Sequence, residues 1–92
     1  MNVEDWRSKI DAIDSALLHL LNLRMVYAVE IGRLKSSEGA EIRVPAREQD
    51  ILKRMKSANP GPLDDQAIEK IYQLIFDESK RMQDMHGAGN GR

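Results

Sequence analysis

The sequence predicts an all-α fold of three helices, one long, one short and one of medium length. Apolar residues recur at steps of three and four in three segments, which is the spacing of one helix face. No segment shows the alternation of apolar and polar residues that is typical of a β-strand. Apart from Gly32, glycine and proline stand at or between the ends of these segments, where they start or end helices.

The first helix is predicted from about Val3 to Ser37, with Gly39 at the position of a C-terminal cap. No proline interrupts it, and it is far longer than the average globular helix of about 12 residues. Such a helix cannot fold back on itself, so other elements or a second chain must cover its apolar stripe. The stripe comprises Ile10, Ile13, Leu17, Leu20, Leu21, Ala28 and Ile31.

A connector of residues 38–44 leads to the second helix, which is predicted to begin at Pro45. Proline suits the first turn of a helix, and Glu48 is favourable near the positive N-terminal end. The run Asn59-Pro60-Gly61-Pro62 is expected to end this helix. Its short apolar stripe consists of Ile51, Leu52 and Met55.

The third helix is predicted to open at Asp64 and Asp65, whose carboxylates suit a helix N-terminus, and to end near Met85. Residues 87–92 are rich in glycine and are expected to be disordered, so the predicted folded domain comprises residues 1–86. The expected buried face of the third helix consists of Ile68, Ile71, Leu74, Ile75 and Met82.

Composition excludes several classes of function. The 92 residues include 14 basic and 15 acidic ones, a net charge of -1, which argues against a basic surface for nucleic acid or anionic membranes. The absence of cysteine excludes disulfides, thiolate metal sites and a cysteine nucleophile.

We find no uninterrupted run of about 18 apolar residues and no leader-like N-terminus, so we expect a cytoplasmic protein without a membrane span. A single domain of this size often oligomerises, and no further catalytic domain is expected.

Cationic residues interrupt the apolar face of the first helix. Arg24 and Lys35 point to one side, about 16 Å apart along the axis, where two long side chains could hold a small dianion. Arg7 lies about 25 Å before Arg24 and points about 100° away, so it cannot join that site in its own chain. It could join the site of a second chain packed antiparallel. Spacing alone leaves solvated surface charges as the alternative.

Polar residues also pair on the other two helices. Ser79 and Gln83 stand four residues apart and therefore share a face of the third helix. Arg47 and Glu48 open the second helix. Taken separately, Ser79 and Gln83 fit a polar stripe on an exposed side, and Arg47 and Glu48 fit simple helix-end electrostatics. The two histidines have no partners at metal-ligand spacing, so no metal site is predicted.

Together, these residues resemble the all-helical class of chorismate mutase from Trp6 to about Gln83. Each matching fragment is short, but their order and spacing along one chain are specific to that family. The fragments are WRSKIDAID (6–14), LLNLR (20–24), AVEIGRLK (28–35), PARE (45–48) and FDES (76–79), followed by Gln83.

The resemblance implies an intertwined homodimer in which the long first helices pair and each site borrows an arginine from the partner chain. Arg24, together with Arg7 from the partner, is then expected to bind the two carboxylates of chorismate. Lys35 is expected to contact a carboxylate and the ether oxygen. Gln83 is the expected second donor to that oxygen.

The resemblance also implies that Glu48 holds the ring hydroxyl and that Ser79 and Arg47 complete the carboxylate shell. Some relatives carry an acidic residue where Val44 stands. Val44 offers only its backbone N–H there, so the hydroxyl contact falls mainly to Glu48. Other relatives carry a glutamate at the position of Gln83, which must be protonated to donate. Because an amide needs no proton, we expect no loss of activity between about pH 6 and 8.

The implied reaction converts chorismate into prephenate, a step of phenylalanine and tyrosine biosynthesis in the shikimate pathway. It is a [3,3] rearrangement within one molecule and needs no cofactor, metal, nucleophile or proton transfer. The site must hold the folded, diaxial conformer of the substrate and stabilise the charge that develops on the ether oxygen.

Two alternatives stay open from the sequence. Isochorismate-pyruvate lyase resembles the same fold and site, and release of salicylate and pyruvate from isochorismate would identify it. A non-catalytic helical dimerisation or regulatory module would explain the long helix but not the matching site residues. Absence of chorismate binding would favour that module.

Overall fold

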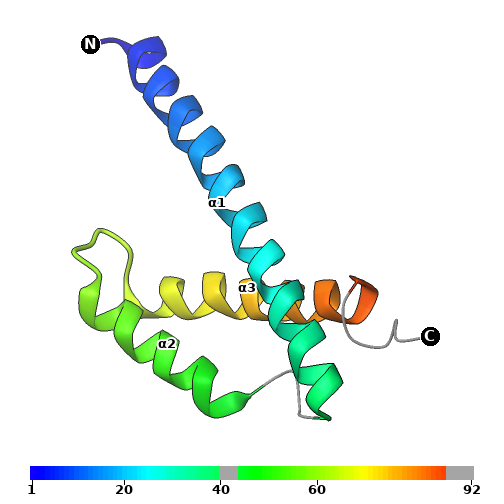
Figure 1. Ribbon diagram of the computed structural model, residues 1–92. Coiled ribbons are helices and arrows are strands. Elements are labelled where there is room, and N and C mark those ends of the chain that lie inside the picture. Colours follow the sequence, from blue (N-terminus) through cyan, green and yellow to red (C-terminus); the bar gives the residue numbers. More distant parts are fainter. Residues whose placement is uncertain (40–43, 87–92) are drawn as a thin grey trace.

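The structure is a computed structural model that describes residues 1–39 and 44–86. It contains helices α1 (Val3–Glu38), α2 (Pro45–Ala58) and α3 (Asp65–His86), with no strand within the described ranges (Figure 1). The predicted all-α class is confirmed, and each helix begins and ends within a residue of its predicted bounds. The predicted disorder of residues 87–92 and most of the predicted connector, residues 40–43, lie outside the described residues.

Local hydrogen bonds account for the helix ends. The Asn2 side chain accepts from the backbone N–H of Asp5 at 2.9 Å, and the Asp5 carboxylate accepts from the backbone N–H of Asn2 at 2.8 Å. This reciprocal pair satisfies two N–H groups that a helix start otherwise leaves unbonded. At the other end of α1, Gly39 has the left-handed φ of 73° that favours glycine, as predicted for the C-terminal cap. The Asp64 carboxylate accepts from the backbone N–H of Ala67 at 2.8 Å at the start of α3.

The small core lies between α2 and α3. Ile51 and Leu52 of α2 are buried against Phe76 of α3, and Met55 and Tyr72 pack around them. The rings of Tyr72 and Phe76 lie 6.0 Å apart in a tilted arrangement. The ammonium of Lys56 and the carboxylate of Glu69 approach to 2.6 Å and join the same two helices at the surface. The predicted apolar stripe of the second helix is thus confirmed. The C-terminal half of α1 crosses α3 and completes this packed part of the chain (Figure 1).

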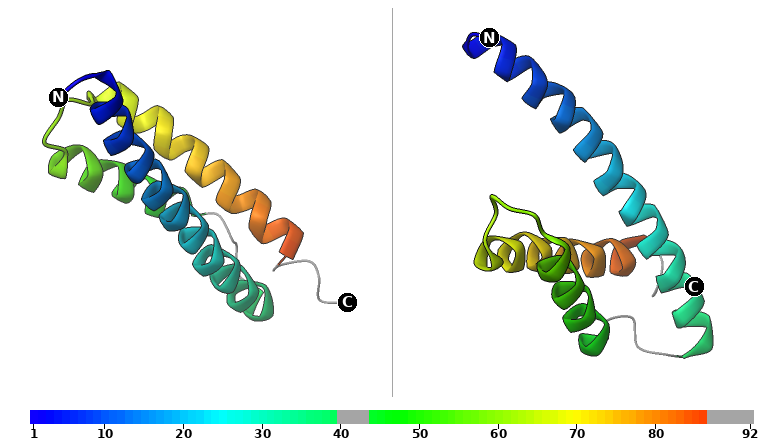
Figure 2. Two further views of the ribbon diagram at one scale, coloured as in Figure 1. Left: turned by 90° about the horizontal axis from the view of Figure 1, so that it is seen from above. Right: turned by 90° about the vertical axis from the view of Figure 1, so that its left-hand side faces the viewer.

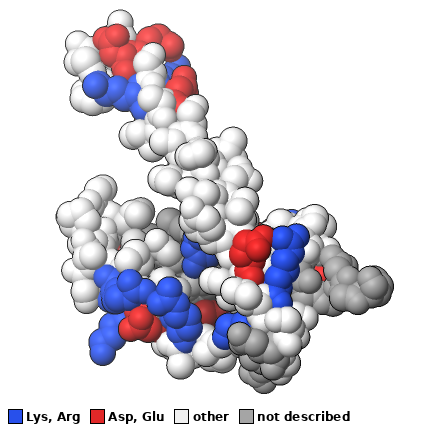
Figure 3. Space-filling model, in the orientation of Figure 1, with Lys and Arg blue, Asp and Glu red and all other residues white. Residues whose placement is uncertain are grey.

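The N-terminal half of α1 projects beyond α2 and α3 (Figure 2), which gives the molecule extents of 55 × 26 × 15 Å. Its side chains are exposed throughout, so its own chain does not cover the apolar stripe predicted there. The face of this half that is visible in Figure 3 is largely uncharged between its charged tip and the charged residues near the crossing. The large apolar side chains exposed along it are Val3, Trp6, Ile10, Ile13, Leu17, Leu18 and Leu20.

The expectation that the chain has no membrane span stays a prediction. By length and composition alone, α1 is able to cross a membrane, because it contains an 18-residue window with a mean hydropathy of 1.2. A search for uninterrupted apolar runs misses this window, since its leucines, valines and isoleucines outweigh the few polar residues among them. Little of the window is buried within the chain.

The predicted buried face of α3 needs a correction. Ile68 is buried, and Ile75 and Met82 are partly buried, but Ile71 and Leu74 are 44% and 67% exposed. The helix is rotated so that Phe76, at 4% exposure, faces the interior instead. Apolar spacing identified a stripe along this helix, but the positions of α1 and α2 decide which edge of the stripe is covered.

Candidate active site

The packed part of the chain contains a cavity of about 500 Å³ bounded by the C-terminal half of α1, the start of α2 and the C-terminal half of α3. This volume lies within the range of about 300–1,000 Å³ that is usual for small-molecule sites. All of the site residues predicted from the sequence line it, except Arg7. The lining residues are Arg24, Tyr27, Ala28, Ile31, Lys35, Val44, Arg47, Glu48, Ile51, Phe76, Ser79, Lys80 and Gln83.

Helix periodicity explains how α3 contributes to the cavity. Phe76, Ser79, Lys80 and Gln83 follow the i, i+3, i+4, i+7 spacing of a single helix face. On α1, Arg24, Ala28 and Lys35 likewise recur near whole turns, so both helices present one polar stripe to the same space.

Arg24 is positioned by two residues of α3. Its guanidinium donates to the hydroxyl of Ser79 at 2.8 Å and lies 5.8 Å from the centroid of the Phe76 ring. A cation over an aromatic face is stabilised by the negative face of the ring. These contacts fix the guanidinium at the cavity wall and leave further N–H donors of its planar fork for an anion.

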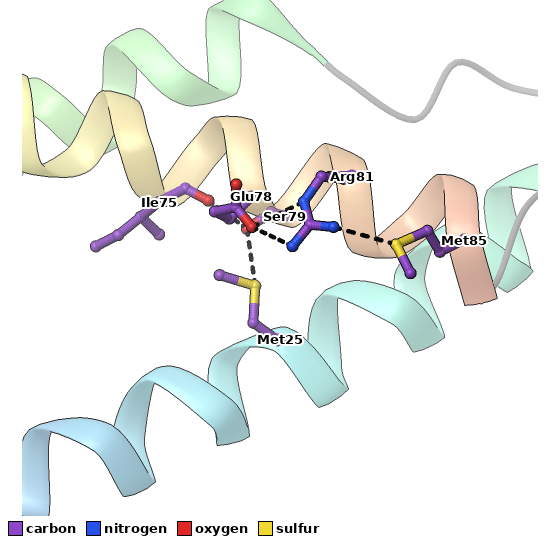
Figure 4. Close-up of polar contacts among 6 residues, drawn as sticks. All are labelled: Met25, Ile75, Glu78, Ser79, Arg81 and Met85. Atoms are coloured by element: carbon purple, nitrogen blue, oxygen red, sulfur yellow. Dashed lines mark hydrogen bonds and ion pairs between the residues drawn. The ribbon is translucent and has the colours of Figure 1, made fainter.

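Ser79 is itself held in place. Its hydroxyl lies 2.8 Å from the backbone carbonyl of Ile75, one turn earlier in α3, and 3.6 Å from the sulfur of Met25 in α1 (Figure 4). A serine hydroxyl has one proton to donate and two lone pairs to accept with, so donation to either group is compatible with acceptance from Arg24. Ser79 therefore links α3 to both Arg24 and Met25 on α1.

Gln83 is the only buried polar side chain among the described residues, with 7% of its surface exposed. Its amide nitrogen donates to the backbone carbonyl of Ala28 at 2.8 Å. A primary amide carries two N–H groups, so this bond orients the side chain and leaves a second donor for a ligand.

Gly32 makes the position of Gln83 sterically accessible. A Cβ atom on Gly32 would lie 2.9 Å from Cγ and 3.1 Å from Cβ of Gln83. Only glycine at this turn of α1 allows α3 to approach so closely without a shift of the amide. Ala28 and Gly32, one turn apart on α1, together form the surface on which Gln83 rests.

Positive charge dominates the cavity wall. Among the described residues, the cations that line it are Arg24, Lys35, Arg47 and Lys80, against a single acidic residue, Glu48. The guanidinium of Arg47 also lies 3.8 Å from the carboxylate of Asp50, outside the cavity. Guanidinium and ammonium groups converging on a space of this size suit a small ligand with more than one carboxylate.

The structure places Arg7 away from this cavity. Arg7 lies on the projecting half of α1, where its side chain is 68% exposed and pairs with Glu4 at 3.1 Å. Spacing along the helix had already indicated that Arg7 cannot reach Arg24 and Lys35 in its own chain. The functional roles assigned to all of these residues from the resemblance stay predictions.

Sequence reasoning missed Lys80 and the apolar wall of the cavity. Lys80 follows Ser79 and precedes Gln83 by three residues, so helical spacing was a sufficient signal for it. Tyr27, Ile31 and Ile51 carried no such signal, because their place in the cavity depends on how the helices pack.

Comparison with known proteins places the chain in a family. A family model described as chorismate mutase type II matches residues 6–84. A bifunctional chorismate mutase/prephenate dehydratase of Neisseria gonorrhoeae is 40% identical over 72 residues, which cover 78% of this chain and 19% of that protein. The corresponding protein of Aquifex aeolicus is 35% identical over 78 residues, covering 80% and 22%. The chain thus spans about a fifth of the length of these curated relatives.

Solved structures agree with this result. A chorismate mutase from Thermus thermophilus superposes with a TM-score of 0.90 at 30% identity, covering 92% of this chain and 97% of that one. A chorismate mutase from Helicobacter pylori in complex with prephenate gives a TM-score of 0.85 at 32% identity and covers 91% of each chain. Since the family model matches most of its length, the chain belongs to the chorismate mutase type II family.

Proposed function

We propose that this chain catalyses the rearrangement of chorismate to prephenate. Three findings support the proposal: the family match over residues 6–84, the solved relative that holds prephenate, and a cationic cavity of suitable volume. The observation that carries it is the convergence of Arg24, Lys35 and Gln83, from two helices, on that one cavity.

The reaction is balanced within one molecule. The ether C–O bond breaks, a new C–C bond forms, and no group enters or leaves. Catalysis therefore consists of holding the reactive conformer and of stabilising the charge that builds up on the ether oxygen. Arg24 and Arg47 bind carboxylates, and their binding energy offsets the cost of the folded diaxial geometry.

Lys35 and Gln83 act on the ether oxygen. Both are hydrogen-bond donors, and the oxygen becomes a better acceptor as the C–O bond breaks, so they bind the transition state more tightly than the ground state. The hydrogen bond from Gln83 to the Ala28 carbonyl keeps its second N–H aimed in a fixed direction. Glu48 and the backbone N–H of Val44 contact the ring hydroxyl, and Ser79 supports the carboxylate site through Arg24.

The active form is a homodimer in which the projecting halves of α1 pair. The exposed apolar stripe supports this arrangement, since a continuous apolar surface of this kind marks an interaction site. The pairing brings Arg7 of one chain to the cavity of the other. A partner chain rather than lipid covers the stripe, because Arg24 in the C-terminal half of the same helix packs against Ser79 and Phe76 of α3.

The test is the ultraviolet measurement of chorismate consumption by the wild type and by Gln83→Ala, with prephenate identified as the product. We expect rapid conversion by the wild type and a loss of about 10²–10³-fold in the variant, as for other single donors to a developing oxyanion. Gln73→Ala is the matched control, because Gln73 lies exposed on the same helix, outside the cavity lining, where its amide donates to Asp77 at 3.2 Å. We expect it to keep wild-type activity.

Failure of the wild-type dimer to convert chorismate would contradict the proposal. Isochorismate would then be supplied, and release of salicylate and pyruvate would assign the related lyase reaction to the same cavity. Failure to bind either compound would favour a non-catalytic helical module.

A further inference from the structure

Lys80 is a cavity cation whose charge is already engaged. It lines the cavity on the same face of α3 as Ser79 and Gln83. Its ammonium lies 2.8 Å from each carboxylate oxygen of Asp84, one turn further along α3. Asp84 is exposed and does not line the cavity, so Lys80 lies at the boundary between the cavity and the outer surface.

The ion pair is weak enough to be exchanged. The side chains of Lys80 and Asp84 are 40% and 52% exposed, and pairs of this kind on a helix surface contribute little because water screens them. The lysine ammonium ends a flexible four-carbon stem, so it can reorient without movement of the helix. An anion in the cavity is surrounded by Arg24, Lys35 and Arg47 as well, and it therefore offers Lys80 a competing partner.

We propose that Lys80 is a further substrate-binding cation and that Asp84 competes with a substrate carboxylate for it. Asp84 thereby lowers the affinity of the cavity for dianions, because it holds the ammonium of Lys80 outside the cavity. The inference rests on the proposed function only for the identity of the ligand, since the competition itself requires no more than a dicarboxylate in the cavity.

This arrangement predicts effects of opposite sign for the two partners. Removal of the ammonium by Lys80→Met should weaken ligand binding by about three- to tenfold, the effect of one partly screened charge. Removal of the competing carboxylate by Asp84→Asn should strengthen it by about two- to threefold. If the pair only stabilised α3, both variants would instead change the ligand affinity in the same direction. Methionine keeps the length and helix propensity of the lysine stem, which preserves the fold.

The experiment measures prephenate binding by titration calorimetry for the wild type, both single variants and the double variant, at low and high salt. We expect the double variant to resemble Lys80→Met, because Asp84 acts through Lys80. We expect all differences to shrink at high salt, and kcat for chorismate to change less than KM. Glu78→Gln is the matched control: the Glu78–Arg81 pair, at 2.8 Å, lies on the same helix but outside the cavity lining (Figure 4).

The outcomes separate this inference from the proposed function. Equal affinities, or shifts in the same direction for Lys80→Met and Asp84→Asn, would overturn the role of Lys80 while leaving wild-type turnover of chorismate intact. Opposite shifts in a protein that does not convert chorismate would overturn the proposed reaction and retain the anion site. A wild type that binds no prephenate would overturn both.

Discussion

The two halves of α1 carry similar apolar stripes but differ in what covers them. The C-terminal half contacts α3, buries Ala28 and Gly32, and presents Arg24 and Lys35 to the cavity. The N-terminal half projects with Ile10, Ile13 and Leu17 exposed (Figure 2). An apolar stripe thus predicts which face of a helix packs, but not which element or chain it packs against. Substitutions in the apolar stripe of the N-terminal half should accordingly weaken association, whereas substitutions at the cavity wall in the C-terminal half should lower turnover.

Leu17→Asp should have the largest effect, because it places a charge in the projecting stripe of both chains. Burial of an unpaired carboxylate in an apolar contact costs several kcal/mol, so we expect the dimer to weaken by at least about 10³-fold and activity to fall with it. Analytical ultracentrifugation together with chorismate turnover measures both. Leu63→Asp is the control, since Leu63 is exposed in the α2–α3 connection and its change should leave the dimer intact. A Leu17→Asp protein that sediments as an active dimer would remove the projecting stripe from the interface.

Arg7→Ala tests whether the projecting half also contributes to catalysis. We expect a loss of at least about 10²-fold without dissociation of the dimer, as for loss of a charge-assisted contact to a carboxylate. The same loss is expected for Arg24→Ala. Lys9→Ala, at an exposed cation of the same helix, should retain activity.

Coexpression of the two arginine variants gives the decisive measurement. In a mixed dimer, one of the two sites combines the intact Arg24 of one chain with the intact Arg7 of the other. Because about half of the dimers are mixed at statistical pairing, about a quarter of wild-type activity should return. No recovery is expected if each site uses both arginines of a single chain. Recovery therefore distinguishes a shared site from a remote structural role of Arg7.

Gly32→Ala tests the packed half of α1. The new methyl group would approach Cγ of Gln83 to 2.9 Å, so the amide must move away from its position on Ala28. Because small misplacements of a donor are costly in catalysis, we expect kcat to fall by about tenfold or more while the dimer persists. In a background of Gln83→Ala, the same change should have a much smaller effect. Equal effects in both backgrounds would show that Gly32 acts on the fold and not through Gln83. Ser36→Ala serves as the control, because Ser36 is an exposed residue of the same helix.

The smallest expected effect is that of pH on the wild type. The Gln83 amide does not titrate, so kcat should be nearly constant between about pH 6 and 8. Gln83→Glu should instead lose activity as pH rises through the pKa of the introduced carboxyl, because only its protonated form donates. Gln73→Glu, on the exposed side of α3, should keep the flat profile. A falling wild-type profile would indicate another titrating donor.

The surface pair next to the site should not disturb that profile. The hydrogen bond and the charge of Glu78 raise the pKa of Arg81 above its usual value. A cation with a raised pKa stabilises the folded state fully at pH values below the unfolded pKa, and this contribution is lost only as pH rises further. The Arg81 guanidinium therefore stays charged throughout the range in which activity is measured.

Several elements could be predicted from the sequence because they depend on neighbours along the chain. Pro45 and the run 59–62 set the limits of α2, and Gly39 ends α1 through its left-handed backbone. Arg24 and Lys35 share one side of a helix by periodicity alone. The predicted burial of Ile71 and Leu74 was wrong, since local spacing does not specify the rotation of α3 against α1 and α2.

The site likewise combines features that depend on neighbours along the chain with features that depend on packing between helices. The resemblance singled out residues from all three helices, and all except Arg7 line one cavity. It did not single out Lys80, although helical spacing was a sufficient signal for that residue. The hydrogen bond from Gln83 to Ala28 and the close approach of Gly32 could not be predicted in this way, because they join residues from helices that are far apart in the sequence.

The sequence by itself determined the helices, their ends and the polar residues on each face, because hydrogen bonds within helices and the preferences of proline and glycine are local. Only the tertiary structure decided that Phe76 rather than Leu74 is buried, that Gln83 rests on Ala28 and Gly32, and that half of α1 stays uncovered by its own chain. These features arise from close packing between helices, in which the shape of each surface selects the rotation and the contacts of the other.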